Sequence, residues 1–268
     1  MTPLTPASLL GLAEKTAREA GDLVRDRREA VERMTVAGTK STPTDVVTES
    51  DTAAEALIRS RLFAARPDDG FVGEEDGVVV GSTGVDWVVD PIDGTVNYLY
   101  GIPQYAVSIA AQVDGVVVAG VVLNPASGET WTAVQGGGAF LDGRPVRVSS
   151  CESLSLALVG TGFGYDAGRR ARQASVLLEV VPRVRDIRRA GAAALDLCSV
   201  ASGRLDAYYE RGLNPWDLAA GGLIAAEAGA VVSGLRGAPA GNDLALAATP
   251  GVAAELTALL ERLGADRD

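Results

Sequence analysis

The first quarter of the chain places apolar residues at the spacing of amphipathic helices. A long helix is predicted over Pro6–Met34, because its apolar positions recur every three or four residues. These positions are Leu9, Leu12, Ala13, Ala17, Ala20, Leu23 and Val24. The polar stretch Gly38–Thr44 predicts a loop or an edge hairpin. A second helix is predicted over Asp51–Ala65, with Thr52 and Glu55 at the spacing of a capping box.

The middle of the chain changes to short apolar runs. The run Val85–Val89 predicts a buried strand. Further strands are predicted over Ala106–Val113, Val116–Leu123, Thr130–Val134 and Gly138–Leu141. The Asp114-Gly115 pair between the first two of these suits a tight hairpin turn. The middle is therefore predicted to form an antiparallel meander.

After Ser149, predicted helices and strands alternate. The helices are Ala171–Val181, Ala190–Ala201, Trp216–Ala228 and Val252–Leu263, and the strands are Leu156–Gly160, Leu205–Tyr209, Ala230–Ser233 and Leu244–Ala248. Gly160–Gly164 lacks the third glycine and the Lys-Ser/Thr ending of a nucleotide loop, and predicts a turn at a strand end. We expect an α+β half over residues 1–148 and an α/β half over residues 149–268.

Charge and composition narrow the function. The chain has 24 basic and 35 acidic residues, a net charge of −11, and no histidine. No basic face for nucleic acid is visible. An acidic protein that handles a phosphate ester would repel it unless bound cations reverse the local charge. Without histidine, Ser-His-Asp and Cys-His catalysis and histidine-ligated zinc are excluded, so a general base must be a carboxylate, a hydroxyl or metal-bound water.

The remaining composition points to a reduced, non-membrane setting. Cys151 and Cys198 are far apart and predict two reduced thiols rather than a disulfide. The longest apolar stretch, Leu218–Val232, carries Glu227 and is too short for a bilayer, which takes roughly 20 apolar residues. Met1–Leu12 does not resemble a signal peptide. A cytoplasmic protein that contacts neither membrane nor nucleic acid is expected.

The strongest chemical signal is the string Trp87–Thr95. Its apolar strand ends in Asp90, Asp93 follows three residues later, and Gly94 permits a tight bend. Two carboxylates on one rigid turn, with the Ile92 carbonyl between them, offer the oxygen ligands that Mg²⁺ or Mn²⁺ prefers. Thr95 could cap a following helix, whose free N–H groups would suit a phosphate. The alternative is a polar, Asp-rich turn after a strand, but such a turn gives no reason for the full order of apolar residues, acid, proline, acid, glycine and threonine.

Other acidic segments have simpler explanations when each is considered alone. Glu74-Glu75-Asp76 fits a solvated turn, and Asp217 fits the first turn of a helix, where acids stabilise by roughly 0.3–1 kcal/mol. Asp51 fits a helix N-cap, Lys40 a surface lysine, and Glu210-Arg211 an exposed ion pair.

Taken together, these segments resemble the inositol monophosphatase family. The resemblance rests on Asp90-Pro-Ile-Asp-Gly-Thr95, on Gly73-Glu-Glu75 upstream and on Trp216-Asp217 downstream, and covers the chain from Lys40 to about Gly229. It implies a layered αβαβα sandwich like that of the fructose bisphosphatases, a homodimer, and inhibition by lithium. It also implies two or three Mg²⁺ ions, with Mn²⁺ as an alternative.

The resemblance also assigns roles to particular residues. The implied metal ligands are Glu74, Asp90, the Ile92 carbonyl, Asp93 and Asp217, with Asp90 bridging two ions. Thr95 and Glu74 would orient the attacking water, and Asp51 would hydrogen-bond Thr95. The implied substrate contacts are Ile92, Asp93, Gly94, Thr95, Gly191, Ala192, Ala193, Glu210 and Asp217. Asn214 stands where some members have histidine, which affects selectivity rather than chemistry.

The implied activity is hydrolysis of myo-inositol 1-phosphate, or a similar sugar or polyol phosphate, by a metal-activated water. Fructose 1,6-bisphosphate, 3′-phosphoadenosine 5′-phosphate and histidinol phosphate remain alternatives, because several arginines could supply extra positive charge. These arginines are Arg188, Arg189, Arg204 and Arg211. A non-catalytic regulatory protein on the same fold is a further alternative, although the intact acidic set favours an enzyme.

Overall fold

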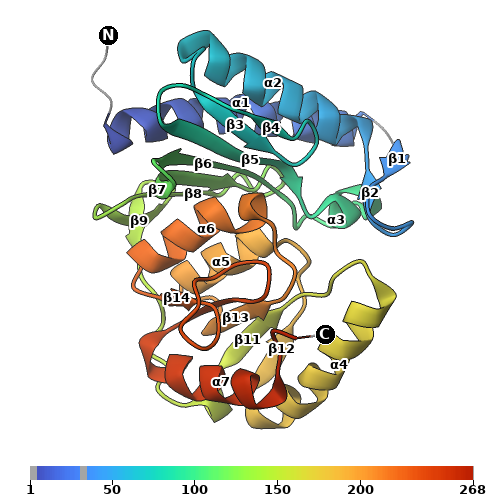
Figure 1. Ribbon diagram of the computed structural model, residues 1–268, viewed down its shortest axis with the longest axis vertical. Coiled ribbons are helices and arrows are strands. Elements are labelled where there is room, and N and C mark those ends of the chain that lie inside the picture. The colour runs from blue at the N-terminus through green and yellow to red at the C-terminus, as the bar shows by residue number, and fades with distance from the viewer. Residues whose placement is uncertain (1–4, 31–34, 268) are drawn as a thin grey trace.

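The computed structural model describes residues 5–30 and 35–267. Five layers are stacked along the long axis of the molecule: two helices, a large sheet, two helices, a smaller sheet and two helices (Figure 1). The predicted layered αβαβα architecture is therefore confirmed. No helix among the described residues is long and apolar enough to span a bilayer.

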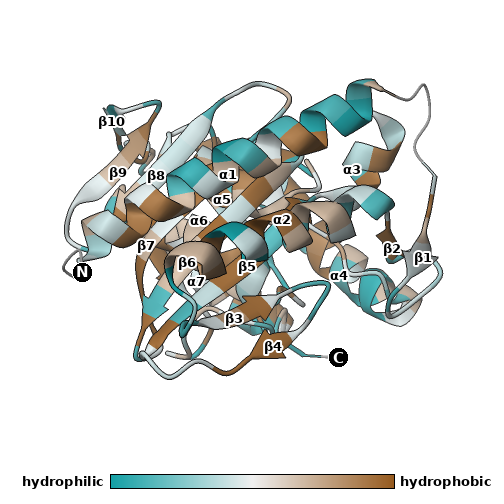
Figure 2. Cartoon of the chain, turned by 90° about the horizontal axis from the view of Figure 1, so that it is seen from above, coloured by the Kyte–Doolittle hydropathy of each residue, from teal (hydrophilic) through white to brown (hydrophobic). Residues whose placement is uncertain are grey.

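The first layer contains α1 (Pro6–Glu29) and α2 (Glu49–Ala65), which lie side by side over the large sheet (Figure 2). Alanines such as Ala13, Ala17 and Ala20 face the sheet and are fully buried, whereas polar residues line the outer side of α1. The sequence pattern for α1 is confirmed as far as Glu29, while the predicted continuation to Met34 lies outside the described residues.

The large sheet has the order β10-β9-β8-β7-β6-β5-β3-β4. Its strands are β3 (Gly70–Gly73), β4 (Val78–Val79), β5 (Val85–Asp93), β6 (Ala106–Val113), β7 (Val116–Leu123), β8 (Thr130–Val134), β9 (Gly138–Leu141) and β10 (Arg144–Val146). Pairing is antiparallel throughout, except that β3 and β5 run parallel. The predicted meander is confirmed, and Asp114 and Gly115 form its first hairpin turn with positive φ angles of 49° and 81°. The short strands β3, β4 and β10 lie outside the elements predicted from the sequence.

The inner helix layer separates the two sheets. It consists of α5 (Ala193–Ala201) and α6 (Pro215–Glu227), whose apolar side chains pack against the large sheet on one side and the small sheet on the other. Gly120 on β7 lets α6 approach closely, since a Cβ at this position would lie 3.0 Å from Ala220 Cα. This close packing fixes the N-terminal end of α6 beside the end of β5.

The small sheet has the order β12-β11-β13-β15-β14 and is covered on its outer face by two helices (Figure 1). Its strands are β11 (Leu158–Thr161), β12 (Asp186–Arg188), β13 (Ala207–Glu210), β14 (Val231–Ser233) and β15 (Ala245–Ala248). The covering helices are α4 (Ala167–Val180) and α7 (Pro250–Leu263). The predicted turn after Gly160 is confirmed, because β11 ends at Thr161.

Two small elements complete the fold beside the end of β5. Strands β1 (Gly38–Thr39) and β2 (Val46–Val47) pair as a small antiparallel hairpin. Of the two structures predicted for this segment, a loop or an edge hairpin, the hairpin is therefore confirmed. Helix α3 (Thr95–Tyr100) follows β5 directly. Its N-cap is Gly94, in a left-handed conformation with φ of 90°, so the prediction that Thr95 is the cap was wrong.

Candidate active site

A β-bulge places Asp90 and Asp93 in one site. Residues three apart on a regular strand point to opposite faces. Here Asp90 pairs with Ser108 and Asp93 with Ala106, so the segment carries one more residue than the facing β6. Pro91 tolerates the interruption because it has no N–H to donate to the ladder. Both carboxylates are buried, with 1% and 7% of their residue surfaces exposed.

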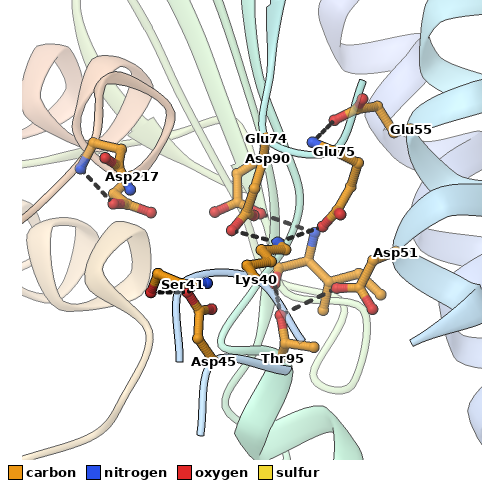
Figure 3. Close-up of polar contacts among 12 residues, drawn as sticks. Lys40, Ser41, Asp45, Asp51, Glu55, Glu74, Glu75, Asp90, Thr95 and Asp217 are labelled. Atoms are coloured by element: carbon orange, nitrogen blue, oxygen red, sulfur yellow. Dashed lines mark hydrogen bonds and ion pairs between the residues drawn. The ribbon is translucent and has the colours of Figure 1, made fainter. Parts of the chain in front are cut away.

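Asp217, in the first turn of helix α6, completes the carboxylate cluster. Oxygen atoms of Asp90, Asp93 and Asp217 lie within 4.8 Å of one another. Asp90 is the central member, since the charges of Glu74, Asp93 and Asp217 all act on its carboxyl group. Figure 3 shows Glu74 and Asp90 together at the end of the large sheet, with Asp217 facing them from α6. The bridging role expected for Asp90 stays a prediction.

Three of the site carboxylates also hold helix N-termini. Asp51 accepts the Thr48 N–H at 2.8 Å at the start of α2, and Asp217 accepts the Asn214 N–H at 2.7 Å at the start of α6. Asp93 accepts the N–H groups of Ala193 and Ala194 at 3.2 and 2.7 Å at the start of α5. The positive ends of three helices therefore converge on an acidic site and partly offset its charge.

The start of α2 corrects one sequence prediction. The capping box is formed by Thr48 and Asp51, not by Thr52 and Glu55. Thr48 is extended, with φ of −110° and ψ of 163°, so the helix begins four residues earlier than the proposed pair requires. Asp51 is consequently the third helical residue rather than the N-cap. Glu55 instead accepts backbone N–H groups from Glu75 and Asp76, at 2.9 and 2.6 Å.

Thr95 is fixed between two acceptors. Its hydroxyl lies 3.1 Å from Asp51 Oδ1 and 3.1 Å from the Ile92 carbonyl oxygen (Figure 3). A hydroxyl has one proton, so it can donate to only one of them at a time and can accept a proton with its lone pairs. Thr95 can therefore donate to the buried Asp51 while its oxygen accepts a hydrogen bond from a group in the cavity.

Lys40 belongs to the site and is not the surface lysine that its position in the sequence predicted. Its ammonium group lies 2.8 Å from Glu74 Oε1 and 2.6 Å from Glu75 Oε1. The β1–β2 hairpin carries it across the site (Figure 3). Burial opposes the charge on Lys40, but the two glutamates outweigh burial and raise its pKa. The Glu74–Glu75 segment is likewise not a solvated turn, because both side chains are held by this contact.

The electrostatics of the cluster disfavour three ionised carboxylates. Burial, and after it the charge of Glu74, raises the pKa of Asp90 well above its ordinary value. Burial and the charge of Asp217 do the same for Asp93. Burial and Glu74 raise the pKa of Asp217 to about 7. Protons or cations must therefore neutralise this site at neutral pH.

A cavity of about 630 Å³ opens above the cluster and places most of the predicted substrate residues together. Gly94, Thr95, Gly191, Ala193 and Glu210 line it. The predicted contact Ala192 does not line the cavity: its side chain is 1% exposed and packs in the core between the large sheet and the inner helices.

Glu210 is held in the cavity wall and is not the exposed ion pair suggested by its neighbour Arg211. It accepts a hydrogen bond from the Tyr208 hydroxyl and packs against Gly162, where any side chain would collide with its carboxylate. Burial raises the pKa of Glu210, opposed by the Tyr208 hydroxyl and by the positive charge of Arg189. A carboxylate fixed in this way can accept hydrogen bonds from substrate hydroxyls.

The structure separates the four arginines considered for a second anionic group. Only Arg189 lines the main cavity. Arg188 pairs with Asp186, and Arg204 pairs with Glu129. Arg211 lines a separate small pocket.

Sequence reasoning missed several cavity residues that come from loops. These include Ser41, Thr42, Tyr165 and Asn242. They lie in connections, where neither periodicity nor spacing marks a residue as part of a site. Arg169, in the first turn of α4, also lines the cavity and was not identified from the sequence.

Comparison with known proteins agrees with this geometry. Residues 6–268 match the inositol monophosphatase family. Inositol-1-monophosphatase SuhB of Mycobacterium tuberculosis is 52% identical over 275 residues, covering 96% of this chain and 94% of the relative. Nus factor SuhB of Pseudomonas aeruginosa is 43% identical, covering 85% of this chain and 86% of the relative.

Solved structures give the same result at the level of the fold. The structure of Mycobacterium tuberculosis SuhB superposes with a TM-score of 0.84 at 49% identity, covering 97% of this chain and 98% of that chain. The layered sandwich and its carboxylate cluster therefore define a metal-dependent phosphatase. The chain belongs to the inositol monophosphatase family.

Proposed function

We propose that this chain is a Mg²⁺-dependent phosphomonoesterase that hydrolyses myo-inositol 1-phosphate or a similar polyol phosphate. The observation that carries the proposal is the convergence of Asp90, Asp93 and Asp217 at the floor of a cavity whose wall presents Glu210. The first three residues supply a metal site, and the fourth supplies an acceptor for polyol hydroxyls. The names of the M. tuberculosis relatives support the choice of substrate.

The donor set fits magnesium. All the candidate ligands are hard oxygens: the carboxylates of Glu74, Asp90, Asp93 and Asp217 and the Ile92 carbonyl. The raised pKa values of Asp90, Asp93 and Asp217 indicate that the cluster is unfavourable as bare charge, which a divalent cation would relieve. When bound, Mg²⁺ would supply Lewis-acid stabilisation of the phosphoryl oxygens and a more acidic water. Two ions, with a third beside Glu74, or Mn²⁺ in their place, are part of the proposal.

The chain's own residues would perform the remaining tasks. Thr95 and Glu74 would hold the attacking water, and Asp51 would accept a hydrogen bond from the Thr95 hydroxyl. The turn from Ile92 to Thr95 would present backbone N–H groups to the phosphate, and α3 adds the positive end of a short helix. Gly191 and Ala193 would contact the polyol ring, and Glu210 would accept hydrogen bonds from its hydroxyl groups.

The experiment is phosphate release from purified protein, with myo-inositol 1-phosphate, in Mg²⁺ and in excess chelator. We expect release in Mg²⁺ alone, and faster turnover than with fructose 1,6-bisphosphate, 3′-phosphoadenosine 5′-phosphate or histidinol phosphate. Higher kcat/KM for any of these three would replace the proposed substrate. Absence of release from all four would refute the phosphatase proposal and favour the non-catalytic alternative, for which the described geometry offers no separate support.

Two further properties are proposed from family membership. We expect a homodimer, which sedimentation equilibrium would detect as twice the 27.5 kDa chain mass. We also expect lithium to inhibit turnover by competing at the ion held by Asp90, Asp93 and Asp217. Full activity in tens of millimolar lithium would contradict the second expectation without affecting the metal site itself.

A further inference from the structure

Arg169 occupies a slot made by two glycines at the edge of the catalytic cavity. A Cβ on Gly164 would lie 2.9 Å from Arg169 Cδ, and a Cβ on Gly212 would lie 2.6 Å from Arg169 Nη1. Gly164 belongs to the connection between β11 and α4, and Gly212 to the connection between β13 and α6. Only residues without side chains let the arginine lie between these two connections.

Neighbouring contacts fix the helix that carries Arg169. Asp166 Oδ1 accepts the Arg169 N–H at 2.8 Å and caps α4. One turn later, Gln173 accepts the Gly164 N–H at 2.9 Å and donates to the Arg211 carbonyl at 3.2 Å. Both connections are thus tied to the same face of α4, so the position of the Arg169 side chain is set before any ligand arrives.

The guanidinium group of Arg169 has its donors available. Within the part of the chain that the structure describes, Arg169 hydrogen-bonds only through its backbone, and its half-buried side chain makes no ion pair or hydrogen bond. Carboxylates such as Asp45 and Glu210 line the same cavity, but the positive charge that acts on Glu210 is that of Arg189. A half-buried guanidinium offers five donors and no acceptor, and its burial is favourable when those donors find oxygen atoms.

We propose that Arg169 is a specificity-determining residue that donates hydrogen bonds to the hydroxyl oxygens of the substrate's polyol part, away from the phosphate. The inference rests on the proposed phosphatase function. The metal ligands are presented mainly by the large sheet, whereas Arg169 lies on the small-sheet wall beside the end of β13. On this wall Glu210 can accept hydrogen bonds from substrate hydroxyls, and Arg169 supplies the complementary donors. Together they recognise a polyol, because each hydroxyl is both donor and acceptor.

The test compares two esters in the presence of Mg²⁺: myo-inositol 1-phosphate, and ethyl phosphate, which has no polyol. For Arg169→Met, which retains most of the alkyl chain in the glycine slot, we expect KM for inositol 1-phosphate to rise roughly tenfold. Its kcat should change less than about twofold, because the metal site is untouched. Both constants for ethyl phosphate should stay at the wild-type values, and Arg169→Lys should recover part of the lost affinity.

Arg172→Met is the matched control, since Arg172 is exposed on the same helix and donates to the Leu263 carbonyl. Thermal unfolding of each variant checks that the fold is intact. An unchanged KM for inositol 1-phosphate, or an equal loss on both esters, would overturn the inference while leaving the proposed function in place. A wild-type protein that hydrolyses neither ester would instead overturn the proposed function, and the inference with it.

Discussion

Two buried carboxylates at opposite ends of the β3–β5 pair have contrasting surroundings. Asp69, directly before β3, is 2% exposed and accepts hydrogen bonds from Arg66, from the Thr83 hydroxyl at 2.6 Å and from Trp87 Nε1 at 3.0 Å. Asp90, near the end of β5, is 1% exposed and accepts the Ile92 N–H at 3.0 Å. Its other neighbours include three carboxylates.

The difference separates a structural charge from a functional one. The Asp69 carboxylate has a positive partner and enough donors to replace water, as a buried ion in a stable fold requires. The Asp90 carboxylate has like charges instead, so the fold alone does not satisfy it. Ligand sites in sheets with parallel strands lie at the carboxyl ends of those strands, and Asp90 lies at that end of the β3–β5 pair while Asp69 lies at the other.

The largest expected effect comes from Asp90→Asn. An amide keeps the shape and can still accept the Ile92 N–H, but it removes the central charge of the cluster. We expect kcat to fall at least on the order of a hundredfold. Thermal unfolding in chelator should occur at an equal or higher temperature, because like-charge repulsion is reduced, and added Mg²⁺ should stabilise the variant less than wild type.

Asp86→Asn, on the same strand but outside the cavity, serves as the control. Near-normal turnover of Asp90→Asn at ordinary Mg²⁺ would reject the assignment of Asp90 as a metal ligand.

Asp69→Ala should lower stability and leave activity intact, which is the opposite of the effect expected for Asp90→Asn. It leaves Arg66 and the Trp87 N–H without their buried acceptor, which should lower the free energy of unfolding by about 3 kcal/mol. Activity per folded molecule should persist, because Asp69 does not line the cavity. Denaturant unfolding and phosphate release measure the two quantities. The control is the exposed neighbour Asp68→Ala, and equal stability of both variants would show that the contacts of Asp69 do not stabilise the fold.

The pH dependence of stability should reveal the cluster in the absence of metal. The pKa of Asp217 in the folded protein is raised to about 7, above its value in the unfolded chain. The folded state therefore binds more protons between about pH 4 and pH 7, and the free energy of unfolding should fall as the pH rises through that window. Urea unfolding in chelator at pH 5 and pH 7.5 measures this fall. Asp217→Asn should reduce it, whereas an identical slope in the variant would assign the effect elsewhere.

The smallest expected effect concerns Asp51, whose surroundings lie between those of Asp69 and Asp90. Its donors are the Thr48 N–H, the Thr48 hydroxyl and the Thr95 hydroxyl. Thr48→Ala removes the cap of α2 and one of these donors, so we expect a loss of about 1 kcal/mol in unfolding free energy. Thr52→Ala, at the position first considered for the cap, should cost less. A larger loss for Thr52→Ala would contradict the observed start of α2.

Much of the fold could be predicted from periodicity. The long helices and the β6–β9 meander have enough residues for an apolar repeat to be recognised. The strands β3 and β12 have four and three residues, and they exist because a neighbouring strand pairs with them. Their formation depends on partners that are distant in the sequence.

The site was predicted unevenly for the same reason. Asp90 and Asp93 could be recognised because both lie in one short string, and the family resemblance added Glu74, Asp217 and Glu210. Lys40 was misjudged, since its partners Glu74 and Glu75 lie more than thirty residues away and meet it only across the β1–β2 hairpin. Arg169 carried no signal, because its slot is made by glycines from two separate connections.

The sequence by itself determined the class of chemistry. It has many carboxylates and no histidine, which exclude histidine-based catalysis, and one rigid acidic turn, which favours a metal site with oxygen ligands. Only the tertiary structure decided which acids act together. Asp69 and Asp90 are the same residue type with similar burial, but one meets an arginine and the other meets three acids. That distinction depends on which elements pack around each carboxylate, because the stability of a buried charge is set by its neighbours in space.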